Sequence, residues 1–354
     1  MEESNKISLS QLFLLLFLSR FFSVAAYSPS VQGGGDRITL FTTLLSGILQ
    51  FLLLLMGLAL CRRGTGNSPL LVPGSLLYRL QSGAYWFCSM AVCVYTTVNF
   101  ISFITEAIYD HRHGWVVALT FLAAGSLAVS QGLEGLARGG GILTALLVFG
   151  CTVIALGLWE QYDWLNLTVR FLGSADTLRG TWRGLAMNGE LFALLLLMNH
   201  LREPPRPLAC AGWVGGVTVA SVAVQLMTML TLGAYGDQKP FPVFTAVTSA
   251  GFQVFQRLDS IFLAIWVVLG LVKLGVFLGL ASSLAPKVFL RPWTVKWVWG
   301  NGGLAAALAL LLWNGPEKWQ KSFHTILSTG ILTLSGVLLL PLIGKLWEKG
   351  GEKE

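Results

Sequence analysis

Residues 255–278, FQRLDSIFLAIWVVLGLVKLGVFL, decide the fold of this chain. The stretch is entered through Arg257 and Asp259, and its apolar part is long enough to cross the ~30 Å of hydrocarbon in a bilayer. One cation, Lys273, lies near the middle, where a charge is costly and therefore usually has a partner or a task. The stretch predicts a membrane-spanning helix with a polar function inside it.

The composition of the whole chain also indicates a membrane protein. Of its 354 residues, 54% are hydrophobic and 12% are charged, and the mean hydropathy is +0.68. A soluble domain carries about twice that share of charged residues. The net charge of +7 does not indicate nucleic-acid binding, because Lys and Arg gather in short loops and tails, where they set membrane orientation. We expect one integral membrane domain over residues 1–354, with the lipid bilayer as a partner and no nucleic acid.

The apolar residues recur in ten runs of about the length of a membrane span, which predicts an all-α polytopic membrane protein. The expected spans are Ile7–Tyr27, Ile38–Leu60, Leu77–Ile108, Trp115–Leu136, Ile142–Trp159, Gly184–Leu201, Leu208–Tyr235, Leu258–Leu284, Trp297–Trp313 and Thr325–Leu346. The third and the eighth are long enough to tilt or to extend past the membrane.

Basic residues favour a cytoplasmic location for both termini. Arg62 and Arg63 follow the second span, which contains no charge, and Lys345, Lys349 and Lys353 form a basic tail. A cytoplasmic N-terminus places more Lys and Arg on the inner loops than on the outer ones. An even number of spans then returns the C-terminus to the cytoplasmic side.

The first and the sixth span are irregular. Residues 18–29, LSRFFSVAAYSP, carry Arg20 at midplane depth, and residues 184–190, GLAMNGE, end in a glutamate. Asn188 and Gly189 disfavour a helix interior, and Glu190 is costly in lipid. Broken helices five spans apart are typical of inverted-repeat transporters, which bind ligands at free backbone groups of the break. The alternative is that residues 184–190 are only an outer loop and that Glu190 starts a helix.

Each buried ionisable group has two interpretations. Arg20 pairs either with a ligand carboxylate or, in a structural ion pair, with Glu106 or Glu190, and a guanidinium suits both roles. Lys273 is either a fixed cation or a lysine that bonds to the carbonyls of a neighbouring helix. Tyr95 and Asn99 on the third span line a pocket or make ordinary hydrogen bonds between helices.

No motif of an enzyme is present in the sequence. It lacks a nucleophile elbow, a zinc motif and an acidic metal cluster. The five cysteines and the four histidines show no spacing typical of metal ligands. We therefore expect no catalytic residue, no metal site and no cofactor.

Several stretches resemble the endospore germination permeases, the B subunits of nutrient germinant receptors. They are residues 6–13, KISLSQLF, residues 190–199, ELFALLLLMN, and residues 255–277. The last is the most specific, with an aromatic residue, then Arg-Leu-Asp, then Phe-x-Ala-Ile-Trp-Val and a lysine. Pro240-Phe241-Pro242 matches an outer loop of that family, and the length and basic tail fit from end to end.

The resemblance implies a LeuT-like fold of the amino acid–polyamine–organocation superfamily. That fold is a five-plus-five inverted repeat, here about residues 7–163 and 184–346, with broken first and sixth helices. A ligand pocket would lie between the first, third, sixth and eighth spans. The residues expected at it are Arg20, Ser23, Ala25, Tyr95, Asn99, Asn188, Gly189 and Glu190, with Lys273 as a coupling or structural cation. Typical members have a glycine in the first break, where this chain has 19–26, SRFFSVAA, which indicates a different ligand or none.

The resemblance also implies a function. The protein would sense a small, amino acid-like nutrient at midplane and trigger spore germination together with A-type and C-type receptor subunits. Its location would be the spore inner membrane or the cell membrane. The alternatives are an amino-acid or cation-coupled permease of the same fold, and a membrane scaffold whose pocket is vestigial.

Overall fold

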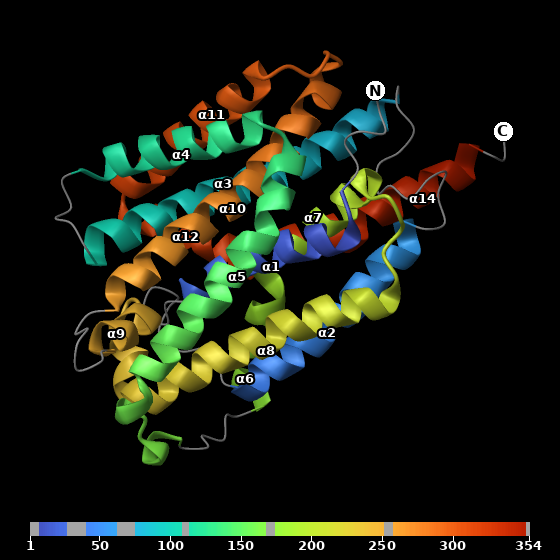
Figure 1. The fold of residues 1–354 in the computed structure, drawn as a ribbon. Coiled ribbons are helices and arrows are strands. Elements are labelled where there is room, and N and C mark those ends of the chain that lie inside the picture. Colours follow the sequence, from blue (N-terminus) through green and yellow to red (C-terminus); the bar gives the residue numbers. More distant parts are fainter. Residues whose placement is uncertain are drawn as a thin grey trace.

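The computed structural model describes residues 7–26, 40–61, 75–107, 113–167, 174–250 and 258–351. Over these residues the chain is a bundle of helices (Figure 1), and its extended backbone pairing is one isolated bridge between Ile7 and Leu201. Six helical stretches are long and apolar enough to cross a membrane, and two shorter helices are also apolar. The chain is therefore an integral membrane protein. Arg62, Arg63 and Arg257 and the side chain of Glu106 lie outside the described part.

The helices of the N-terminal half follow the five expected spans. They are α1 (Leu9–Ala25), α2 (Leu40–Cys61), α3 (Leu76–Ala107), α4 (Gly114–Ser130) and α5 (Leu133–Gly157), followed by the 3-10 turns η3 (Trp159–Gln161) and η4 (Trp164–Asn166). A capping box begins α1: Ser8 Oγ accepts from the Gln11 backbone N–H at 3.2 Å, and Gln11 Oε1 accepts from the Ser8 N–H at 3.0 Å. These bonds satisfy two backbone donors that the first turn leaves without helical partners.

The first helix corrects one expectation. We predicted irregular backbone within residues 18–29, but α1 is regular from Leu9 through Ala25, with Arg20 in its interior. The helix contains no glycine or proline, so no residue removes a backbone hydrogen bond or strongly opposes the helix. Tyr27 to Pro29 lie outside the described residues.

The C-terminal half holds more helices than expected spans. They are α6 (Ser174–Ala186), α7 (Glu190–Leu197), η5 (Met198–His200), α8 (Pro207–Leu232), η6 (Gly233–Gln238), α9 (Pro242–Ser249), α10 (Asp259–Phe289), α11 (Lys296–Asn314), α12 (Glu317–Ser328), α13 (Ile331–Leu334), the π-helical turn η7 (Ser335–Leu339) and α14 (Leu340–Gly351). The break in the sixth span is confirmed, since residues 187–189 separate α6 from α7. The alternative holds in one respect, because Glu190 is the first residue of α7.

The tenth span is also interrupted, although the apolar run Thr325–Leu346 predicts one continuous helix. Gly330 joins α12 to α13 with a φ of +78°, a conformation that glycine adopts without steric cost. A Cβ atom at this position would lie 3.1 Å from the Cβ of Ala186. The interruption of the tenth span therefore packs against the end of α6, at the break in the sixth.

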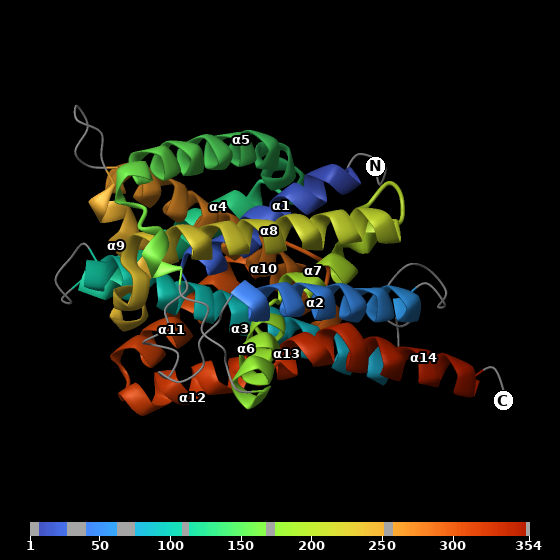
Figure 2. The same ribbon diagram turned by 90° about the horizontal axis from the view of Figure 1, so that it is seen from below.

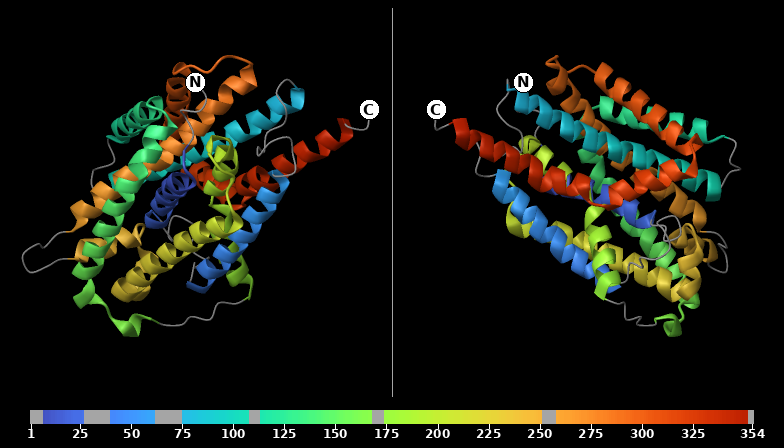
Figure 3. Two further views of the ribbon diagram at one scale, coloured as in Figure 1. Left: turned by 45° about the vertical axis from the view of Figure 1, so that its right-hand side comes forward. Right: turned by 180° about the vertical axis from the view of Figure 1, so that it is seen from behind.

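The helices form two groups, and the broken sixth span, α6 and α7, lies between them. On one side α10 packs against α1, α3, α4 and α11, and on the other α2 pairs with α8 (Figure 1). Figure 2 shows α12, α13 and α14 following one another along one face of the bundle. Figure 3 shows α14 extending past its neighbours, at the same end of the bundle as the start of α1.

Gly47 allows α2 and α8 to approach closely. A Cβ atom at this position would lie 2.4 Å from Thr218 Oγ1 and 2.9 Å from Thr218 Cγ2. We expect Gly47→Val to cost about 1–3 kcal/mol of stability, because the added methyl groups overpack this contact. Protein level in the membrane and melting temperature in detergent measure the effect. Gly215→Ala on α8 is the control, since its Cβ would meet nothing within 4 Å, and equal behaviour of the two variants would contradict the packing argument.

Candidate functional site

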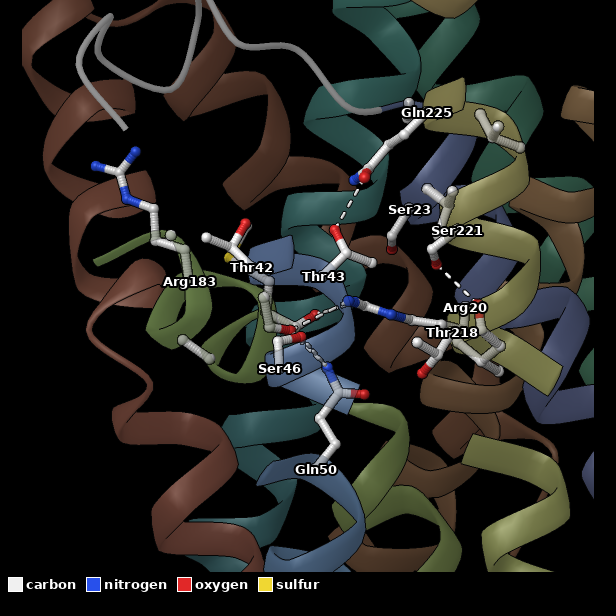
Figure 4. Close-up of a pocket in the computed structure, with 18 of the residues that line it drawn as sticks. Arg20, Ser23, Thr42, Thr43, Ser46, Gln50, Arg183, Thr218, Ser221 and Gln225 are labelled. Carbon is white, nitrogen blue, oxygen red and sulfur yellow. Dashed lines mark hydrogen bonds between the residues drawn. The ribbon is translucent and has the colours of Figure 1, made fainter. Parts of the chain in front are cut away.

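A cavity of about 200 Å³ lies beside the break in the sixth span (Figure 4). Its lining comes from α1, α2, α3, α6, α8, α10 and α13, among other segments. Its polar and charged lining residues are Arg20, Ser23, Thr42, Thr43, Ser46, Gln50, Tyr95, Asn99, Arg183, Thr218, Ser221, Gln225, Thr228, Lys273 and Thr333. A hollow with many polar groups in the centre of an apolar bundle is the default candidate for a ligand site.

Arg20 on α1 and Gln50 on α2 donate hydrogen bonds to backbone carbonyls at the end of α6. Arg20 Nη1 donates to the carbonyl of Met187 at 2.7 Å, and Nη2 donates to that of Gly184 at 3.3 Å. Gln50 Nε2 also donates to the Gly184 carbonyl, at 2.9 Å. The last carbonyls of a helix have no partner in a following turn. These side chains therefore supply the bonds that the break removes.

Two further bonds tie the break to its surroundings. The amide of Asn188 donates to Gln50 Oε1 at 2.8 Å, so Gln50 bonds both to the end of α6 and to the interruption itself. Thr333 Oγ1 on α13 donates to the carbonyl of Ala186 at 2.6 Å. The break is thus bonded to α1, α2 and α13, and a movement of any of them changes its hydrogen bonds.

A buried ion pair lies at the start of α7. Lys273 Nζ donates to Glu190 Oε1 at 2.5 Å, and the side chains of Lys273 and Glu190 are only 4% and 0% exposed. Ser19 Oγ donates to the same oxygen at 2.8 Å, while Glu190 Oε2 has no hydrogen-bond partner among the described residues. A carboxylate is favoured at the positive end of a helix. The pair joins α10 to α7 in the middle of the bundle.

The structure corrects one alternative for each buried cation. Arg20 does not form the internal pair with Glu190, because it bonds to carbonyls of the break. Lys273 does not bond to carbonyls of a neighbouring helix but to the Glu190 carboxylate. The guanidinium lies within Coulombic range of Glu190 without bonding to it. The cause is position: Arg20 on α1 lies beside the end of α6, whereas Lys273 lies beside the start of α7.

Trp266 fixes the part of α10 that presents Lys273. Its ring lies 4.1 Å from that of Phe103, 4.9 Å from Phe22 and 5.0 Å from Phe100, measured between centroids. These rings belong to α1 and α3, and offset aromatic pairs add stability beyond the area they bury. Lys273 lies about two turns further along the same helix, so the cluster sets its depth and direction.

The structure brings most of the predicted residues together. Arg20, Ser23, Tyr95, Asn99, Gly189 and Lys273 line the cavity. Asn188 and Glu190 lie behind the lining and bond to residues that reach it. Ala25 is buried, 6% exposed, and is not a lining residue. The predicted set is therefore the part of the site contributed by α1, α3, α10 and the break, and it lacks Arg183 on α6 and Thr333 on α13.

Most of the polar lining that was not predicted lies on α2 and α8. The polar residues on these helices are Thr42, Thr43, Ser46, Gln50, Thr218, Ser221, Gln225 and Thr228. Thr43 Oγ1 donates to Gln225 Oε1 at 3.0 Å across the two helices. A signal was present in the sequence, because Thr42, Ser46 and Gln50 recur every four residues and so share one helix face. The lack of charge in the second span does not reveal this polar face, whereas the four-residue spacing does.

Comparison with known proteins agrees with the fold. A family model described as spore germination protein matches residues 6–291. The similar solved structures include two of the Eremococcus coleocola manganese transporter, one with a histidine and one with a glutamate replaced by alanine. Their TM-scores are 0.53 and 0.52 and their sequence identities are 11% and 12%. Each alignment covers 95% of this chain and 78% of the transporter. No curated protein matches. The chain therefore has the fold of a membrane transporter and belongs to the family of spore germination proteins.

Proposed function

We propose that the protein is the B subunit of a spore germinant receptor and senses a small nutrient in the cavity beside the α6–α7 break. The observation that carries this proposal is the set of bonds from Arg20 and Gln50 to the backbone of the break, made by side chains that also line the cavity. A ligand that takes a bond from Arg20 competes with the carbonyls of α6. Its binding therefore changes the stability of the break.

The signal would arise from a shift between two states of the bundle. A ligand shifts such an equilibrium only by its differential affinity for the two states. We propose that α1 and α2 move relative to α6 when the nutrient binds and that A-type and C-type subunits bind one of the two states. We also propose that residues 7–163 and 184–346 are the two inverted repeats, within one domain of the spore inner membrane or cell membrane.

The similar solved structures favour a permease as the second candidate function, because the chain shares the fold of a transporter. A cation-coupled amino-acid permease would use the same cavity. Among the described residues, no group of three His, Cys, Asp or Glu side chains could hold a metal ion. Uptake of a radiolabelled nutrient by proteoliposomes containing this protein alone would support the permease.

The receptor proposal is tested by germination in spores that lack the native gene. We expect the wild-type chain to restore the response to a nutrient only when A-type and C-type subunits are present. The protein alone should not accumulate that nutrient in proteoliposomes. Restoration without the other subunits, or strong uptake without them, would contradict the receptor proposal.

We expect both termini of the chain to be cytoplasmic. The basic residues after α2 and in the C-terminal tail favour this orientation, and α1 begins at the end of the bundle where α14 ends (Figure 3). A single cysteine at position 64, in a chain without its native cysteines, should react with a membrane-impermeant maleimide only after the membrane is opened. Labelling of Gly64→Cys in intact cells would overturn this orientation.

A further inference from the structure

We propose that the cavity takes a small hydroxylated anion, of the hydroxy-acid class, in preference to a zwitterionic amino acid. The inference rests on the proposed function, in which this cavity binds the nutrient. It uses the charges of the lining, the bonds already made at the break and the hydroxyl groups of α2 and α8.

The charge of the lining favours an anion. Among the described residues that line the cavity, Arg20, Arg183 and Lys273 are basic and none is acidic. Glu190 neutralises Lys273 from behind the lining, whereas the Arg20 guanidinium bonds to neutral carbonyls, so Arg20 gives this part of the cavity a positive charge. Unlike charges attract strongly in a medium of low dielectric constant. An ammonium group in the cavity would meet the Arg20 guanidinium, and none of the described lining residues offers it a carboxylate.

The backbone of the break does not offer an alternative site for an ammonium group. Transporters with broken helices bind cations through the free carbonyls there. Here the Gly184 carbonyl accepts two bonds, one from Arg20 and one from Gln50, which uses both of its lone pairs. The Met187 carbonyl accepts from the Arg20 guanidinium, whose charge repels a second cation at the same oxygen.

The α2–α8 side of the cavity suits the hydroxyl groups of a ligand. Thr218 Oγ1 and Ser221 Oγ donate to carbonyls of their own helix, each at 2.8 Å. Their oxygen lone pairs therefore remain to accept hydrogen bonds. Gln225 Oε1 accepts from Thr43, so the Gln225 amide nitrogen is available as a donor. Figure 4 shows Thr218, Ser221 and Gln225 on the same side as Arg20.

The test compares three probes with one carbon skeleton: glycerate, serine and glycerol. Glycerate and serine differ only in a hydroxyl group against an ammonium group, and glycerol lacks the carboxylate. Purified protein in lipid nanodiscs is titrated with each by calorimetry, with gluconate as a longer hydroxy acid. We expect glycerate or gluconate to bind at least about tenfold more tightly than serine, a difference of about 1.4 kcal/mol. Glycerol, which lacks the carboxylate, should bind more weakly than glycerate and gluconate.

A second test changes the charge of the cavity at another residue and leaves Arg20 in place, because Arg20 also bonds to the backbone of the break. Gln225→Glu adds a carboxylate to the cavity and leaves an oxygen to accept from Thr43. We expect it to weaken glycerate binding about tenfold and to strengthen serine binding. Gln131→Glu is the control, because Gln131 is exposed at the end of α4 and is not a lining residue, and it should bind both probes like the wild type.

The outcomes separate this inference from the proposed function. If serine binds as tightly as glycerate and gluconate, and Gln225→Glu changes its affinity, the cavity is a nutrient site but the inference about ligand class is wrong. Absence of glycerate and gluconate binding overturns the inference as well. The proposed function fails only if the nutrient that triggers germination also binds equally to the wild type and to Gln225→Glu, or does not bind at all.

Discussion

Lys273→Met is expected to remove most of the folded protein from the membrane. The change leaves the carboxylate of Glu190 buried, 0% exposed, with Ser19 as its remaining bonded partner. Breaking a buried ion pair by removing one partner costs about 3–5 kcal/mol, because the other charge stays without compensation. Glu190→Leu should do the same to Lys273. Immunoblots of membrane fractions and melting temperatures in detergent measure the loss.

The double variant separates the ion pair from simple packing. Lys273→Met combined with Glu190→Gln removes both charges, so it should recover level and melting temperature relative to Lys273→Met alone. Lys321→Met is the control: Lys321 and Glu317 also form an ion pair, at 2.8 Å, but their side chains are 67% and 78% exposed. An exposed pair contributes about 0–1 kcal/mol. A normal level for Lys273→Met would show that the pair does not hold α7 in place.

Arg20→Lys is expected to weaken the nutrient response while the protein level stays near that of the wild type. The guanidinium bonds to Met187 and Gly184 through two different nitrogens, and a lysine ammonium cannot reproduce that planar geometry. Loss of one charge-assisted bond from the guanidinium group to the nutrient, of about 1–3 kcal/mol, should raise the half-maximal nutrient concentration about 5- to 150-fold. Dose–response curves of spore germination, normalised to protein level, provide the measurement.

Two further variants define the role of Arg20. The double variant Arg20→Gln with Glu190→Gln should show no higher protein level in the membrane than Arg20→Gln alone, because the bonded partner of Glu190 is Lys273. Arg138→Lys is the control, since Arg138 is 72% exposed on α5 and pairs with Glu134 one turn away, and its response should match the wild type. Rescue of Arg20→Gln by Glu190→Gln would instead identify Arg20 and Glu190 as the functional pair.

The spans and the sixth-span break could be predicted because local properties determine them. A run of apolar residues of bilayer length forms a helix in lipid, since every backbone polar group must bond within the segment. Asn188 and Gly189 weaken a helix locally, and the break lies at these residues. The polar face of α2 was equally available, because the four-residue spacing of Thr42, Ser46 and Gln50 is a property of the sequence.

The pairing of the buried charges could not be predicted, because it depends on how distant helices pack. Glu190 and Lys273 are 83 positions apart, and Arg20 and Met187 are 167 positions apart. The sequence shows that each buried cation needs an acceptor but does not determine which acceptor lies beside it. The interruption at Gly330 is not predictable from the sequence for a related reason. An isolated glycine in an apolar run is tolerated in a helix, whereas here Gly330 has a positive φ and lies where a Cβ would come close to Ala186 of a distant helix.

The central claim is that the nutrient binds in the cavity beside the α6–α7 break, and filling that cavity tests it most directly. Ser221→Leu places a larger apolar side chain into the lining from α8, whereas Thr152→Leu changes an exposed residue of α5. Binding of the germination-triggering nutrient to nanodiscs is measured by calorimetry for both variants and the wild type. We predict wild-type affinity for Thr152→Leu and no detectable binding for Ser221→Leu at an unchanged melting temperature. Wild-type affinity in Ser221→Leu would contradict the claim.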